Sequence, residues 1–92
     1  MARRRLQVLY EGRVQGVGFR YTAKRTATGF EATGIVRNLS DGRVELIAEG
    51  EHEELIEFQQ AIREAGLSAH IRKETENWTD TTDEFKGFEI VG

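Results

Sequence analysis

The 92-residue chain contains no cysteine. This absence excludes disulfide bonds, thiolate metal sites and a cysteine nucleophile. No apolar run approaches the roughly 20 residues that a membrane-spanning helix needs, so we expect no membrane segment. The arginines at positions 3–5 are followed by alternating residues, without the apolar region of a secretion signal. These absences favour an intracellular, cytoplasmic protein.

Sequence patterns for several other ligands are also missing. The two histidines are isolated, with no carboxylate or cysteine cluster at ligand spacing, so we expect no metal site and no cofactor. The chain has no Gly-Lys-Ser/Thr sequence of a nucleotide P-loop. After Gly16 and Gly18, Tyr21 stands where the dinucleotide-binding fingerprint requires a third glycine.

Charge is distributed unevenly along the chain. Residues 1–43 hold nine basic and three acidic side chains, a balance of +6, whereas residues 44–92 hold four and thirteen, a balance of −9. A basic half suits an anion-binding site, although a solvated surface with a chance imbalance explains the counts equally well. The thirteen acidic residues argue against a nucleic-acid partner.

Alternation and helical spacing of apolar residues indicate the secondary structure. The predicted elements are a strand over 5–12, a helix over 21–28 ended by Gly29, strands over 33–38 and 43–49 joined by an Asp41-Gly42 turn, a helix over 51–65 closed by Gly66, an edge strand over 70–78, and a last strand over 85–91 with Phe88 and Ile90 inward.

The order of these elements predicts the fold. It is the split β-α-β-β-α-β arrangement of ferredoxin-like domains, an α+β fold in which we expect an antiparallel sheet with two helices on one face. The length allows a single domain over residues 1–92. RNA-binding domains share this fold but need aromatic residues on the central strands, and residues 44–47 supply none.

A glycine-rich stretch joins the first strand to the first helix. Glycine permits positive φ angles and close approach of the backbone to a ligand. Successive N–H groups and a helix N-terminus then converge on an anion, and Arg20 adds a planar, charged fork that matches phosphate. Alternatively, the glycines only make a tight connection between strand and helix, and Arg20 is a solvated arginine at the start of the helix. The predicted phosphate-binding loop uses the backbone of Gln15, Gly16, Val17, Gly18, Phe19 and Arg20.

Two segments carry a resemblance to a known family. Residues 12–20, Gly-Arg-Val-Gln-Gly-Val-Gly-Phe-Arg, closely resemble the signature loop of acylphosphatases. Residues 34–38, Gly-Ile-Val-Arg-Asn, with 41–44, Asp-Gly-Arg-Val, are similar to its second motif. Ile35 departs from the aromatic residue usual in the family, and residues 65–68 lack the proline often found there.

The resemblance implies metal-independent hydrolysis of the carboxyl–phosphate bond of a small acyl phosphate, giving a carboxylate and inorganic phosphate. It implies that Arg20 binds the phosphate and that Asn38 positions the attacking water, whereas the residues alone also allow Asn38 to be a turn residue. We expect a monomer. The presence of both Arg20 and Asn38 disfavours a non-catalytic anion-binding module. The free-standing 92-residue chain disfavours a domain of a larger metalloenzyme maturation factor.

Overall fold

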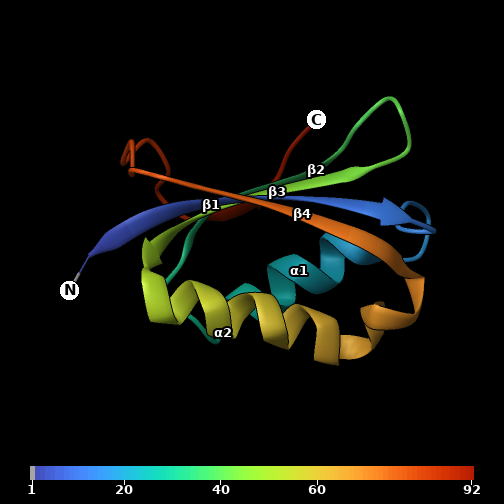
Figure 1. Cartoon of the computed structure of the whole chain (residues 1–92), viewed down its shortest axis with the longest axis horizontal. Helices are drawn as coiled ribbons and strands as arrows, with labels where there is room; N and C mark the ends of the chain where they lie inside the picture. The colour runs from blue at the N-terminus through green and yellow to red at the C-terminus, as the bar shows by residue number, and fades with distance from the viewer. Residues whose placement is uncertain (1) are drawn as a thin grey trace.

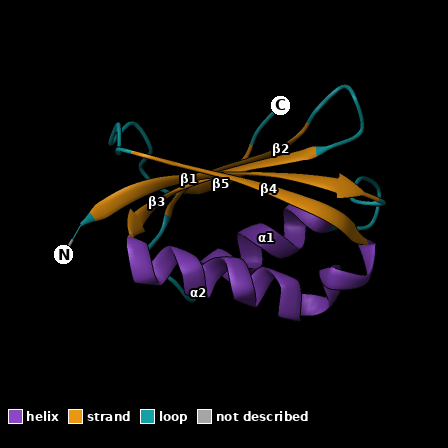
Figure 2. Ribbon diagram, viewed as in Figure 1, coloured by secondary structure: helices purple, strands orange, loops and turns teal. Residues whose placement is uncertain are grey.

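The computed structural model describes residues 2–92. A five-stranded sheet forms one layer, and two helices cover one of its faces (Figures 1 and 2). The predicted ferredoxin-like α+β fold is therefore confirmed. The elements are β1 (Arg3–Gly12), α1 (Phe19–Ala27), β2 (Thr33–Asn38), β3 (Val44–Glu51), α2 (His52–Ile62), β4 (Ile71–Thr79) and β5 (Phe88–Ile90), and the sheet order is β4-β1-β3-β2-β5.

The sheet is mixed, because β5 pairs parallel with β2, whereas the predicted sheet was antiparallel. The remaining neighbours pair antiparallel. β4 and β5 lie at opposite edges, and β4 ends at Thr79, at the end of the sheet where β2 begins. From this end of the sheet the chain crosses from the β4 edge to the β2 edge. Because β5 therefore starts at the end where β2 also starts, the two strands run parallel. Residues 80–87 make the crossing, which leaves three residues for β5 and not the predicted seven.

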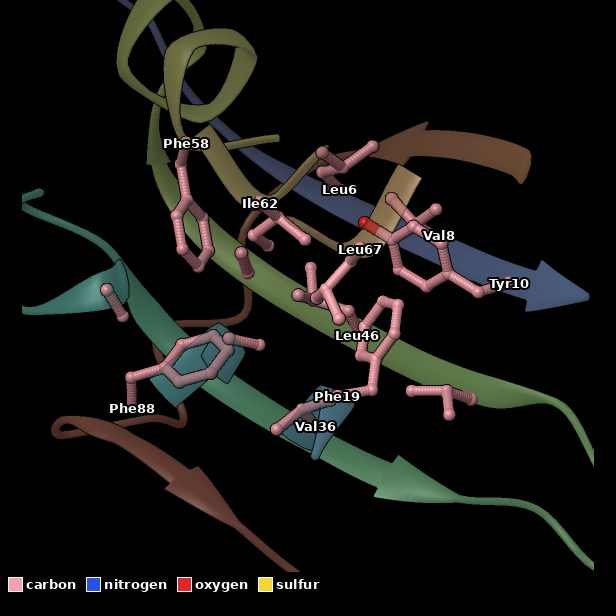
Figure 3. Close-up of a cluster of buried hydrophobic side chains, with 14 of the residues drawn as sticks. Leu6, Val8, Tyr10, Phe19, Val36, Leu46, Phe58, Ile62, Leu67 and Phe88 are labelled. Carbon is pink, nitrogen blue, oxygen red and sulfur yellow. The ribbon is translucent and has the colours of Figure 1, made fainter. Parts of the chain in front are cut away.

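The hydrophobic core lies between the sheet and the helices (Figure 3). Alternate residues of the strands point into it, and each helix contributes residues spaced by three or four positions, as predicted. Ile90 is an exception, because 37% of it is exposed although it was predicted to point inward. The principal core residues are Leu6, Val8 and Tyr10 of β1, Phe19, Ala23 and Ala27 of α1, Val44, Leu46 and Ala48 of β3, and Leu55, Phe58 and Ile62 of α2.

Two predicted boundaries differ at the ends of α1. The helix begins at Phe19, two residues earlier than predicted, because Gly18 adopts a left-handed conformation with φ of 81° as the N-cap. Gly29 is not a left-handed C-cap. The last helical residue is Ala27, and Thr28 is the C-cap, whose backbone N–H bonds to carbonyl oxygens of the last turn. β3 also continues to Glu51, beyond its predicted end at residue 49, because it pairs with the first residues of β1.

A buried carboxylate, Glu49 of β3, holds the crossing segment on the sheet face opposite the helices. Its side chain is fully buried and accepts hydrogen bonds from the backbone N–H groups of Thr82 and Asp83, at 2.9 and 3.0 Å. The Arg5 guanidinium donates to the same carboxylate at 2.9 Å. Burial alone would raise the pKa of Glu49, but these donors together hold it below its ordinary value.

We expect Glu49→Gln to lower the free energy of unfolding by about 3 kcal/mol at pH 7, because the partly buried Arg5 guanidinium and the N–H groups of Thr82 and Asp83 lose a fully buried anion. The folded-state pKa lies below the unfolded-state value, so the charge stabilises the protein above the unfolded pKa and this contribution is lost as the pH falls through the folded pKa. Urea titrations at pH 7 and at pH 3 should show a steeper acid loss in the wild type than in Glu49→Gln.

The matched control is Glu84→Gln, because Glu84 pairs with the same Arg5 nitrogen at 2.8 Å but is largely exposed to solvent. Exposed ion pairs contribute little, so this variant should lose much less stability than Glu49→Gln. Equal stabilities of the wild type and Glu49→Gln at pH 7 would show that the carboxylate does not hold residues 80–87.

Candidate active site

The glycine-rich loop between β1 and α1 is held at both ends by buried side chains. Val14 is fully buried, and Phe19 packs against Tyr10 with ring centroids 4.6 Å apart (Figure 3). Burial raises the pKa of the Tyr10 hydroxyl, so this ring stays neutral within the core. With its ends fixed in the core, the loop presents the exposed backbone around Gly16 and Gly18 to solvent.

The backbone conformation of this loop requires glycine at two positions. Gly16 and Gly18 have φ angles of 78° and 81°, which L-amino acids with a side chain rarely adopt. The Gly18 carbonyl accepts the first helical hydrogen bond, from the Thr22 N–H at 2.9 Å. Within residues 2–92, no side chain caps the start of α1, and its first turn holds no acidic residue. The positive end of α1 is thus available to an anion.

The side chain of Gln15 joins the loop to the β2–β3 hairpin. Its Nε2 donates to the carbonyl oxygens of Leu39 and Arg43, at 2.8 and 2.9 Å. These carbonyls flank the turn that directly follows Asn38, and the Leu39 N–H closes the same turn onto the Arg43 oxygen. Sequence reasoning assigned a role only to the Gln15 backbone. The anchoring role was missed because its partners are 24 and 28 positions away.

One cavity of about 190 Å³ brings the predicted site residues together. Arg20 and Asn38 both line it, although 18 positions separate them in the chain. Larger hollows, of about 420 Å³ beside Gly12 and about 510 Å³ between α2 and β4, include neither residue. Gln15 and Val17 do not line the cavity, whereas three residues outside the prediction do: Val14, Tyr21 and Ile90. The full lining is Val14, Gly16, Gly18, Phe19, Arg20, Tyr21, Asn38 and Ile90.

Arg20 and Asn38 each carry a polar group that no other described residue satisfies. Nearby Lys24 pairs with Glu89 at 3.2 Å, whereas Arg20 has no ion pair among the described residues. The Asn38 Oδ1 atom is buried and, in the chain from residue 2 onward, has no hydrogen-bond partner. Leaving such a buried oxygen unbonded costs about 1–3 kcal/mol. Both groups are therefore available to a ligand in the cavity.

The chemistry open to this cavity is binding and positioning. Its lining contains no aspartate, glutamate, histidine, lysine or cysteine, so Tyr21 is its only side chain of a type that serves in general acid–base catalysis. Across residues 2–92, no three His, Cys, Asp or Glu side chains are grouped as metal ligands would be. The described helices include none that is long and apolar enough to span a membrane.

A model of the acylphosphatase family matches residues 6–90. The chain belongs to the acylphosphatase family. Members of this family hydrolyse acyl phosphates, and the chain is accordingly a hydrolase acting on acid anhydrides. The acylphosphatase of Salinibacter ruber is 40% identical over 87 residues, which are 95% of this chain and 92% of that protein. The acylphosphatase of Thermobifida fusca is 36% identical over 89 residues, covering 97% and 98%.

Solved structures agree with this family assignment. The crystal structure of acylphosphatase from Bacillus subtilis matches with a TM-score of 0.87 and 31% identity, covering 97% of this chain and 99% of that one. Full-length HypF in its phosphate- and nucleotide-bound form matches with a TM-score of 0.86 and 33% identity. That match covers 98% of this chain but 12% of HypF, so the same fold also occurs within a much longer protein.

Proposed function

We propose that this chain hydrolyses the carboxyl–phosphate bond of small acyl phosphates without a metal, using Arg20 and Asn38. One observation carries the proposal: a guanidinium without an ion pair and a buried amide oxygen without a donor line the same cavity as the glycine-rich backbone, within residues 2–92. Arg20 binds the phosphoryl group with the N–H groups of residues 15–20, and Asn38 holds the attacking water.

Phosphate binding accounts for most of the proposed catalysis. Phosphoryl transfer passes through a loose transition state in which negative charge spreads over the equatorial oxygens. Fixed N–H donors at the start of α1 and the Arg20 fork are suited to stabilise this charge. The bond between phosphorus and the carboxyl oxygen breaks as the bond from phosphorus to water forms. The carboxylate leaves as a stable anion and needs no proton from the protein.

The attacking water needs orientation more than activation. The Asn38 Oδ1 atom accepts a hydrogen bond from the water, and the neutral amide does not repel the phosphate as a carboxylate would. Asn38 holds the water in line with the departing carboxyl oxygen. The attack of water then becomes an effectively unimolecular step, which lowers its entropic cost. The water's protons pass to the phosphate product and to solvent.

The proposal includes a monomeric, cytoplasmic protein with one domain over residues 1–92 and no nucleic-acid partner. The family model supports the single domain, since it extends over residues 6–90. The lack of cysteine favours a reducing compartment. The acidic second half of the chain disfavours nucleic acid.

We expect the purified protein to hydrolyse benzoyl phosphate, followed by its ultraviolet absorbance, with the same kcat before and after treatment with a chelator. The physical reason is that the cavity stabilises charge with Arg20 and N–H groups and has no carboxylate to hold a metal ion. A strict need for Mg²⁺ would contradict the proposed mechanism. Phosphate binding without any turnover would favour a non-catalytic anion-binding module.

A further inference from the structure

Large apolar side chains that are exposed to solvent gather around the active-site cavity. Among the described residues there are four of them: Val17, Tyr21, Ile56 and Ile90. Tyr21 and Ile90 line the cavity itself, and Val17 belongs to the loop that forms it. Exposed apolar residues scattered singly need no explanation, but three out of four beside one cavity form a candidate binding surface.

The fold keeps Tyr21 at the surface. The buried residues of α1 are Phe19, Ala23 and Ala27, so Tyr21 projects about 200° away from Phe19 around the helix. The guanidinium carbon of Arg25 lies 5.9 Å from the centre of the Tyr21 ring. This cation–π contact supports one face of the ring, while 66% of the residue remains exposed.

The sheet brings Ile90 to the same cavity. Ile90 pairs with Val36 of β2, two residues before Asn38, through the parallel pairing of β5. It is 37% exposed although its neighbour Phe88 is buried in the core. The short edge strand thus places an aliphatic side chain beside the proposed water-holding residue, where it gains little from core packing.

We propose that Val17, Tyr21 and Ile90, here called the acyl surface, bind the acyl group of the substrate, and that this group is apolar. The inference rests on the proposed function. If the N–H groups and Arg20 hold the phosphoryl group, the acyl group extends from the bridging oxygen toward the rim of the cavity. An apolar acyl group there covers exposed side chains, whereas a charged one would lose hydration against Tyr21 and Ile90.

The test compares benzoyl phosphate with acetyl phosphate, which share the phosphoryl group and differ in apolar area. The two substrates also differ in intrinsic reactivity. For each protein we therefore take the ratio of kcat/KM for benzoyl phosphate to kcat/KM for acetyl phosphate. Dividing the ratio of a variant by that of the wild type cancels the difference in reactivity. We expect Tyr21→Ala to lower the benzoyl-to-acetyl ratio about tenfold, or about 1.4 kcal/mol. Ile90→Ser should lower it about threefold, and Tyr21→Phe should preserve it.

Ile56→Ala is the matched control, because Ile56 is 42% exposed on α2 and lies outside this cavity. It should change neither kcat/KM value. An unchanged ratio in Tyr21→Ala, or equal losses for both substrates, would overturn the acyl surface. Because Tyr21 faces solvent, we expect its variants to fold. They therefore test the acyl surface even if Ile90→Ser unfolds. Failure of the wild type to hydrolyse either substrate would instead refute the proposed function.

Discussion

Replacement of Arg20 by alanine or lysine is expected to lower kcat/KM for benzoyl phosphate by about 10³-fold or more. Arg20 is the only cationic residue that lines the cavity within the described chain. Alanine removes its charge. Lysine retains a charge but cannot reproduce the planar fork that binds two phosphate oxygens at once, so both variants should be nearly inactive. Steady-state kinetics and the inhibition constant of inorganic phosphate would measure the losses.

The control for Arg20 is Arg13→Ala. Arg13 belongs to the same connection between β1 and α1 and is exposed, but it does not line the cavity. If overall positive charge attracted the substrate, both alanine variants would lose activity to a similar extent. We expect Arg13→Ala to stay within about twofold of the wild type, as usual for a solvated surface residue. Activity near the wild-type level in folded Arg20→Ala would remove Arg20 from the mechanism.

Asn38→Ala is expected to lower kcat by about 10²- to 10³-fold while changing the inhibition constant of phosphate by less than about threefold. The proposed role of Asn38 is to place the water, so its loss should affect turnover and leave phosphate binding to Arg20 and the loop. The variant also removes a buried oxygen that lacks a donor in residues 2–92, so the folded state should lose little stability.

Two further variants make the Asn38 experiment decisive. Asn38→Asp keeps the shape but adds a negative charge beside the phosphate, so it should weaken phosphate inhibition as well as turnover. Asn77→Ala is the control, because Asn77 lies exposed on edge strand β4 and should behave as the wild type. Parallel losses of phosphate affinity and kcat in Asn38→Ala would show that Asn38 is a phosphate ligand.

The elements that sequence predicts well are those with strong local patterns. The alternation of Leu6, Val8 and Tyr10 and the spacing of Leu55, Phe58 and Ile62 each match the period of one element. The Asp41-Gly42 turn is equally local, and Gly42 has a φ of 96° as such a turn requires. The sequence-based prediction of β5 was wrong because tertiary contacts determine this strand. Its direction and length depend on the crossing segment, which the buried Glu49 holds.

By itself, the sequence determined the ferredoxin-like order of elements, the acylphosphatase family and the glycine-rich loop, because these reside in short-range patterns. Only the tertiary structure placed Arg20 and Asn38 at one cavity, tied the loop to the hairpin through Gln15, and brought Ile90 beside them. The physical reason is that pairing between strands and hydrogen bonds across 24 or more positions depend on the whole sheet. No local sequence pattern contains that information.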